Sequence, residues 1–150
     1  MQGIRSVPIT LAILLAAFSP AFADDADSPE PPAAEQEGEY DWLIEHPTIQ
    51  RLLKLHNETR ARYGRGPLTL NTEMCLQAQA HAKKMADYGW FAHSGLPYYE
   101  NIAYSQRNAA AAVQTWTYSP AHFNNMLRGT QVGFGYALRN GTPYWVAVFR

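Results

Sequence analysis

The 150-residue sequence contains a single cysteine, Cys75, so no disulfide can form within one chain. This excludes a small exported scaffold held by cross-links, and the fold must depend on its hydrophobic core. A domain of about 110 residues can bury enough apolar surface for that. Cys75 shares a helical apolar stripe with Ala78 and Ala82, which predicts that it is a small core residue.

Apolar runs of membrane-spanning length are also missing. The run Ile9–Phe18 is about ten residues long, which is too short to cross a bilayer but suits the hydrophobic part of a secretory signal. Arg5 precedes this run, and the small residues Ala21 and Ala23 follow it. We therefore predict a signal peptide over residues 1–23, a secreted or periplasmic (cell-envelope) location, and no transmembrane segment in the mature protein.

Basic side chains are absent from residues 24–41, which hold eight acidic residues and three prolines. Such a segment buries too little apolar surface to offset its ordering entropy, so it is predicted to be a disordered tether. Residues 42–150 then carry five acidic and eleven basic side chains, a net charge of about +6. The positive charge favours an anionic partner such as a cell-wall polymer or a lipid headgroup, and plain solubility is the alternative explanation.

Several catalytic signatures are missing as well. The sequence has no helical zinc-protease motif, no glycine-rich phosphate loop and no nucleophile-elbow serine. Its aromatic residues are not interleaved with basic ones, which argues against nucleic-acid binding.

What is present is a chain of helices followed by a hairpin. Apolar periodicity and capping residues predict helices over 47–63 and 72–88, after Asn108, and over 120–127. Extended segments are predicted at 68–70, 100–103, 131–137 and 144–149, the last two joined at Asn140-Gly141. This order indicates an α+β domain over residues 42–150, with an antiparallel sheet between helical layers.

The candidate chemistry lies in His93, Glu100 and His122. His93 is in an irregular stretch, Glu100 is the one acid between the two histidines, and His122 is in the first turn of a helix, where the pKa of an imidazole is lowered. Two histidines and a glutamate suit Zn²⁺ with water as a further ligand. The same set can activate water for hydrolysis, with Glu100 as the catalytic group, and spacing alone also allows that the three share no site.

Other histidines have plainer interpretations. His56 lies on the apolar face of the first helix, and we predict a structural role in one buried hydrogen-bond network with Asn57 and Arg60. His46 is predicted to be solvated, and His81 to be at the surface or half-buried.

The sequence resembles the CAP superfamily of cysteine-rich secretory, antigen 5 and pathogenesis-related proteins, in its short bacterial branch. The segments that carry the resemblance occur in the family's order: Leu55–Arg60, Ala78–Met85, Phe91–Ser94, Glu100–Ala103, Trp116–Leu127, Val132–Gly135 and Tyr144–Phe149. The family's disulfides are absent here. Ser119 stands where many members have a second glutamate, which weakens any hydrolytic scheme that needs two carboxylates.

The resemblance implies a three-layer α-β-α sandwich with a solvent-open cleft at His93, Glu100 and His122. We expect Ser94, Asn101 and Ser119 to line this cleft, and Zn²⁺ or another divalent cation to bind there. The implied function is a non-catalytic extracytoplasmic binding module for a lipid or cell-wall component. The alternatives are a metal-assisted hydrolase of peptides or wall polymers and a structural or protein-interaction domain.

Overall fold

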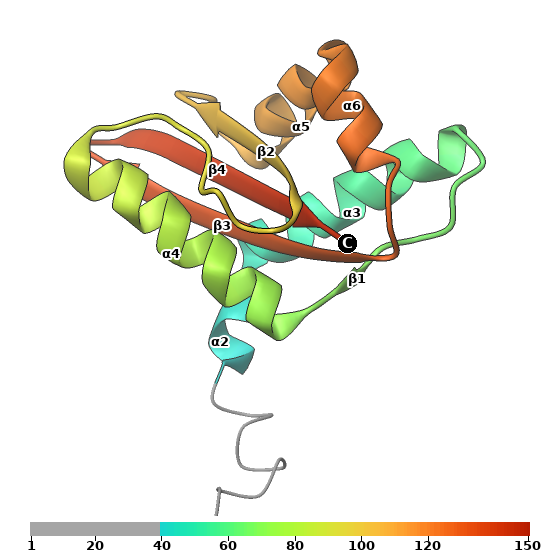
Figure 1. The fold of residues 1–150 in the computed structure, drawn as a ribbon, viewed down its shortest axis with the longest axis horizontal. Coiled ribbons are helices and arrows are strands. Elements are labelled where there is room, and N and C mark those ends of the chain that lie inside the picture. Colours follow the sequence, from blue (N-terminus) through green and yellow to red (C-terminus); the bar gives the residue numbers. More distant parts are fainter. Residues whose placement is uncertain (1–39) are drawn as a thin grey trace, which may run out of the picture. The chain divides into compact units, whose positions relative to one another are not determined.

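The computed structural model describes residues 40–150, so the predicted signal peptide and most of the predicted tether lie outside the described residues (Figure 1). The helices are α2 (Asp41–Ile44), α3 (Pro47–Arg62), α4 (Thr72–Tyr88), α5 (Ala109–Tyr118) and α6 (Pro120–Met126). The strands are β1 (Thr69–Leu70), β2 (Tyr99–Tyr104), β3 (Gln131–Arg139) and β4 (Thr142–Phe149). The predicted helices and the C-terminal hairpin are confirmed, and the short helix α2 is an addition to them.

Local chemistry explains where the long helices begin and end. The side-chain oxygen of Asn71 accepts a hydrogen bond from the Met74 amide at 3.0 Å, and Asn108 caps α5 in the same way. Side-chain capping of this kind satisfies amide groups that have no partner inside the helix. Gly89 ends α4 with φ of 63°, a left-handed conformation that glycine adopts without steric cost.

The four strands form one sheet in the order β1-β3-β4-β2. Strands β3 and β4 form the antiparallel hairpin, and β2 is antiparallel to β4. The sheet is nevertheless mixed, because Thr69 and Leu70 of β1 pair in parallel with Gln131 and Val132 of β3. The long connection from β1 to β3, which includes α4, permits this parallel pairing.

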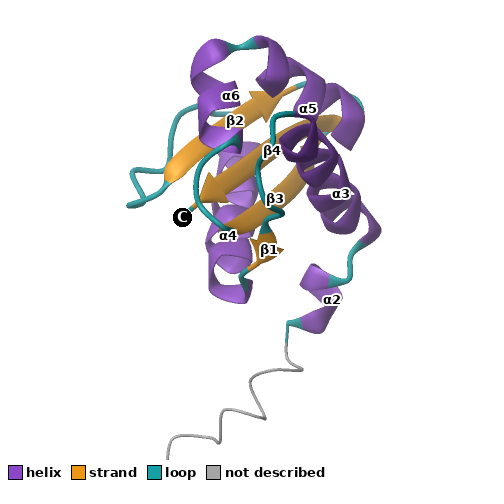
Figure 2. Ribbon diagram, turned by 90° about the vertical axis from the view of Figure 1, so that its right-hand side faces the viewer, coloured by secondary structure: helices purple, strands orange, loops and turns teal. Residues whose placement is uncertain are grey.

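Helices cover both faces of the sheet, which confirms the three-layer α-β-α arrangement (Figure 2). The core accordingly divides into two clusters, with α4 on one face and α3 and α5 on the other. Strand β4 is buried on both faces, with alternate residues in each cluster: Tyr144, Val146 and Val148 toward α4, and Trp145, Ala147 and Phe149 toward α3 and α5.

The contact between α4 and the sheet depends on two glycines in β3. A Cβ atom added to Gly133 would overlap the backbone of Met74, and one added to Gly135 would overlap the backbone of Ala78. The helix therefore lies directly against the strand, at a distance that only glycine permits at these positions.

The outer edge of β2 is closed by side chains from the two helices that follow it. The Trp116 indole donates to the carbonyl oxygen of Ile102 at 3.1 Å, and the Asn125 amide donates to that of Glu100 at 3.3 Å. These bonds occupy backbone acceptors that an exposed edge strand would offer to another chain. They also fasten α5 and α6 beside Glu100.

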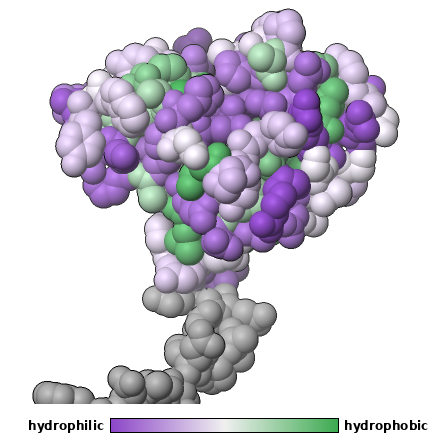
Figure 3. Space-filling model, in the orientation of Figure 1, coloured by the Kyte–Doolittle hydropathy of each residue, from purple (hydrophilic) through white to green (hydrophobic). Residues whose placement is uncertain are grey.

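The face seen in Figure 3 is largely hydrophilic, with small and separated hydrophobic patches. Within residues 40–150, no helix has both the length and the apolar character needed to cross a bilayer.

Candidate functional site

The loop between α4 and β2 places His93 over Glu100, the second residue of β2. The His93 Nδ1 and Glu100 Oε1 atoms are 2.6 Å apart, and the Ser94 amide donates to the same carboxylate oxygen at 2.9 Å. The His93 side chain is 61% exposed, whereas that of Glu100 is only 7% exposed. A buried carboxylate thus fixes an exposed imidazole and leaves its Nε2 atom available to a ligand.

His122 lies in the first turn of α6 and is positioned through its backbone. The fully buried Asn101 donates to the carbonyl oxygen of His122 at 2.9 Å and accepts from Asn125 at 3.0 Å. Burial lowers the pKa of His122, and the positive charge of a protonated His93 lowers it further. The lowered pKa was predicted from the sequence, but its cause is desolvation and the neighbouring histidine.

Both histidines line one open cavity of about 550 Å³. The other lining residues are Phe91, Ala92, Ile102, Ala103, Tyr104, Gln106 and Thr115. Three buried polar atoms at or beneath this cavity have no hydrogen-bond partner among the described residues: Glu100 Oε2, Gln106 Oε1 and His122 Nδ1. Buried polar atoms are normally satisfied, so each of these three atoms lacks an expected partner, although each has almost no accessible surface of its own.

The cavity lining does not include Ser94, Asn101 or Ser119, which we expected there. Ser94 uses its amide to hold Glu100, and Asn101 is fully buried beneath α6. Ser119 lies where α5 meets α6, and its carbonyl oxygen accepts a hydrogen bond from the Phe123 amide at 2.8 Å. Ser94 and Asn101 thus help to position Glu100 and His122, and Ser119 begins α6, the helix that carries His122.

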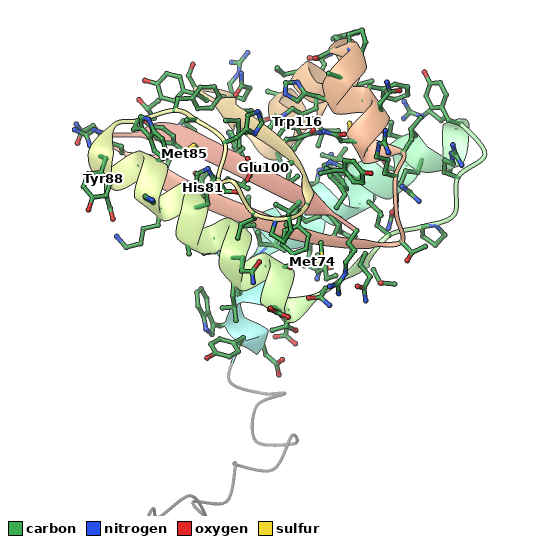
Figure 4. All side chains as sticks on the ribbon, in the orientation of Figure 1. Met74, His81, Met85, Tyr88, Glu100 and Trp116 are labelled. Carbon is green, nitrogen blue, oxygen red and sulfur yellow. The ribbon has the colours of Figure 1, made fainter. Side chains whose placement is uncertain are left out.

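The prediction that His81 is at the surface or half-buried is wrong, because it is only 6% exposed. Its Nε2 atom is 2.8 Å from the carbonyl oxygen of Ala92, the residue before His93. Figure 4 shows His81 on α4, with Glu100 between it and Trp116 of α5 in that view. The sequence signal was its spacing: His81 lies three residues after Ala78 and four before Met85, on the buried side of α4.

His56 is fully buried, and its ring packs against Trp116, Phe134 and Phe149. Its Nδ1 atom is 2.8 Å from the carbonyl oxygen of Leu52, and burial lowers its pKa to about 4. The side chain is therefore a neutral core group.

The shared network predicted for His56, Asn57 and Arg60 is not present among the described residues. Asn57 instead makes two hydrogen bonds with the backbone of Leu68. The Arg60 guanidinium donates to four carbonyl oxygens, those of Gly66, Met126, Arg128 and Gly129. Asn57 and Arg60 therefore stabilise different parts of the chain, and neither is hydrogen-bonded to His56.

A second cavity, of about 530 Å³, lies between α3 and α5 and contains no histidine. Its lining includes Glu58, Arg62, Tyr63 and Tyr118. It is separate from the His93 and His122 cavity, with which it shares no lining residue.

Within residues 40–150, no three His, Cys, Asp or Glu side chains form a group that would hold a metal ion. The two imidazoles share the cavity, while Glu100 is engaged by His93 and Ser94. This geometry suits an oriented imidazole, with Glu100 as its hydrogen-bond partner.

Sequence comparison finds plant and fungal relatives over less than half of the chain. The tomato (Solanum lycopersicum) pathogenesis-related protein 1A1 is 41% identical over 69 residues, which are 45% of this chain and 39% of that protein. A secreted protein of Candida albicans is 39% identical over 67 residues, covering 45% of this chain and 19% of that protein. The chain thus spans less than half the length of these relatives.

Solved structures share the fold at low sequence identity. An extracellular SCP-domain protein from Bacillus anthracis superimposes with a TM-score of 0.54 at 23% identity, over 67% of this chain and 40% of that one. An outer surface protein from Borrelia burgdorferi gives a TM-score of 0.60 at 13% identity, over 70% and 94% of the two chains. The CAP family model, described as the cysteine-rich secretory protein family, matches residues 53–149, and the chain belongs to this family.

Proposed function

We propose that this protein is an extracytoplasmic binding module whose cleft takes up a lipid or cell-wall component without converting it chemically. The supporting observation is that, within residues 40–150, no acidic residue lines the cavity, and the single carboxylate beneath it, Glu100, has its Oε1 atom paired with His93 and Ser94. Ser119 stands at the position where many family members have a second glutamate, so this site has no second carboxylate there. The secreted and extracellular relatives support a location in the cell envelope or outside it.

The proposed cleft also binds a divalent cation such as Zn²⁺ through His93 and His122. His93 would use Nε2, because its Nδ1 atom is paired with Glu100. A carboxylate behind a metal-binding imidazole is a common arrangement that orients the ring. Glu100 is thus a hydrogen-bond partner in this proposal, and water completes the coordination. A structure of NaASP2 with Zn²⁺, which has the same fold at a TM-score of 0.55 and 17% identity, is in keeping with this proposal.

Calorimetry tests the cation site. Zinc titrated into the wild type should release heat that is lost in the His93→Ala/His122→Ala double variant. The matched control is His46→Ala, which removes an exposed imidazole at the start of α3. Equal heats for the wild type and the double variant would remove the cation from the proposal. Native mass spectrometry of protein purified from its source tests the binding module itself, by showing a retained lipid, wall fragment or metal.

A metal-assisted hydrolase is the second candidate, favoured by the 2.6 Å contact between His93 and Glu100. An imidazole held by a carboxylate is well placed to move protons, and a bound cation would supply polarisation of water or a carbonyl group. Turnover of a peptide or wall polymer should then vanish in Glu100→Gln while the fold persists. An activity screen over both substrate classes that stays blank in the presence of zinc would remove this candidate.

A further inference from the structure

The cavity that holds His93 and His122 is one of three hollows that share Tyr104. The second, of about 540 Å³, includes Arg107 in its lining, and the third, of about 310 Å³, includes Arg139. Thr142 lines both the second and the third. The second and third hollows lie on opposite faces of the β3–β4 hairpin and meet at its end, where they share Tyr104 and Thr142. We call these three hollows together the Tyr104 groove. A ligand longer than a single small molecule would occupy more than one of them.

Two exposed aromatic rings line the first hollow, and one of them, Tyr104, also lines the other two. Tyr104 is 45% exposed and Phe91 is 50% exposed, with their ring centroids 6.0 Å apart. The buried Tyr144 supports Tyr104 from below, at a centroid distance of 4.9 Å. Fixed, half-exposed aromatic faces bind flat surfaces that carry C–H groups, and the ring of a sugar is such a surface.

The lining of the groove also includes two buried polar atoms that lack a hydrogen-bond partner within residues 40–150. Gln106 Oε1 and His122 Nδ1 lie in the first hollow and have no hydrogen-bond partner among the described residues. Gln106 Oε1 accepts a hydrogen bond, and His122 Nδ1 donates or accepts according to its tautomer. A hydroxyl group can do both, whereas an acyl chain can do neither. The polar lining therefore favours a hydroxylated ligand over a lipid tail.

The charge of the groove is positive. No acidic residue described in the structure lines any of the three hollows, although Glu100 lies buried beneath His93. Arg107 is exposed and makes no hydrogen bond or ion pair within residues 40–150. Arg139 is fixed by bonds from Nη1 to the carbonyl oxygens of Ala86 and Asp87. A guanidinium on each side of Tyr104 suits carboxylates or phosphates.

We propose that the Tyr104 groove binds an acidic polysaccharide. A sugar ring stacks on Tyr104 and Phe91, a hydroxyl donates to Gln106, and acidic groups pair with Arg107 and Arg139. This inference rests on the proposed function, since it names the ligand class of the same cleft. A nucleic acid fits less well because its binding depends on neutralising a dense row of phosphates, and the groove provides two arginines.

The test measures binding of a galacturonic acid tetramer, the probe, to the purified full chain by calorimetry at low salt. A neutral glucose tetramer and an inorganic polyphosphate of similar charge are the comparison probes. The variants are Tyr104→Ala and Arg107→Gln. Tyr118→Ala and Arg62→Gln are matched controls, because they remove the same residue types from the other cavity, between α3 and α5.

The acidic tetramer should bind more tightly than either comparison probe. Tyr104→Ala should weaken its binding about three- to tenfold, the effect of losing one aromatic contact. Arg107→Gln should weaken it by a similar factor that shrinks as salt is added. The two control variants should bind like the wild type.

Three results would overturn the inference. Polyphosphate binding as tight as the tetramer and insensitive to Tyr104→Ala would show a general anion effect. Tighter, Tyr104-dependent binding of single-stranded DNA or of anionic lipid vesicles would keep a binding cleft but reject the polysaccharide. Absence of binding by the acidic tetramer would reject the polysaccharide. If a retained ligand and zinc heat are absent as well, the proposed function itself is rejected.

Discussion

His81 Nε2 lies 2.8 Å from the carbonyl oxygen of Ala92, so a ring in the middle of α4 holds the residue before His93. On the other side of His93, the Ser94 amide is held by Glu100 at 2.9 Å. The exposed histidine is therefore fastened through both of its chain neighbours. The orientation of His93 is therefore fixed by its neighbours' hydrogen bonds to α4 and β2, and not by the loop alone.

Replacing His81 with phenylalanine should loosen this arrangement. The ring volume is kept in His81→Phe, but the hydrogen bond to Ala92 is lost, which should reduce the free energy of unfolding by about 1 kcal/mol. Amide hydrogen exchange at residues 92–96 should become faster, and zinc affinity should fall by about tenfold, as is typical for residues that orient a ligand. His46→Ala is the control for zinc affinity and loop exchange only, because His46 accepts a hydrogen bond from the Thr48 amide and so caps α3. Unchanged exchange in this loop would contradict the proposed positioning role.

The close contact between α4 and β3 gives a second prediction. In Gly135→Ala the new methyl group would overlap the backbone of Ala78, so the helix must move away from the sheet. We expect a loss of about 3 kcal/mol in the free energy of unfolding, measured with urea. Gly66→Ala is the matched control, because its Cβ would meet no atom within 4 Å. An equal loss of unfolding free energy in Gly135→Ala and Gly66→Ala would show that the close approach of α4 to β3 does not require glycine at position 135.

The elements of the fold were largely predictable because their signals are local. Asn71, Asn108 and Gly89 act on the helix ends beside them, and the Asn140-Gly141 turn sets the final hairpin. The parallel pairing of β1 was not predictable. A two-residue strand carries almost no periodicity, and its partner β3 lies about sixty residues further along the chain.

The site was predictable only in part. Residue types and spacing singled out His93, Glu100 and His122, but the loop before β2 has no periodicity that would fix where His93 points. The family resemblance supplied that expectation. The spacing of His81 on α4 indicated its burial, but its contact with Ala92 depends on where the loop lies, and Arg60 reaches carbonyl groups at residues 126–129. Such contacts are set by tertiary packing, which spacing along the chain does not encode.

The buried imidazole of His56 should make the protein sensitive to acid. Its pKa is lowered to about 4 in the folded state, whereas the unfolded chain takes up a proton near the ordinary value of 6.5. Protons therefore favour the unfolded state, and stability is lost as the pH falls from about 6.5 toward 4. At pH 4.5 this single group should account for roughly 2 to 3 kcal/mol.

Urea unfolding of the wild type and His56→Leu at pH 7.5 and pH 4.5 measures this effect. The loss of stability between the two pH values should be smaller in His56→Leu, because the variant has no buried imidazole to protonate. Zinc affinity at pH 7.5 should be the same in both proteins, since His56 lies in the core and lines neither the cavity nor the loop. An identical loss of stability in both proteins would show that other groups dominate the acid response.

Arg60 links the first long helix to the end of α6, the helix that carries His122. Its planar guanidinium reaches four carbonyl oxygens at once, and the compact ammonium of a lysine cannot span them. Arg60→Lys should therefore leave buried acceptors without a donor and lower the free energy of unfolding by about 2 to 4 kcal/mol. Arg62→Lys, on an exposed position of the same helix, is the control and should change it by less than about 0.5 kcal/mol. If α6 is positioned through Arg60, the zinc affinity of Arg60→Lys should fall at temperatures where the variant is still folded. A variant that is destabilised but binds zinc normally would show that Asn101 alone holds His122 in place.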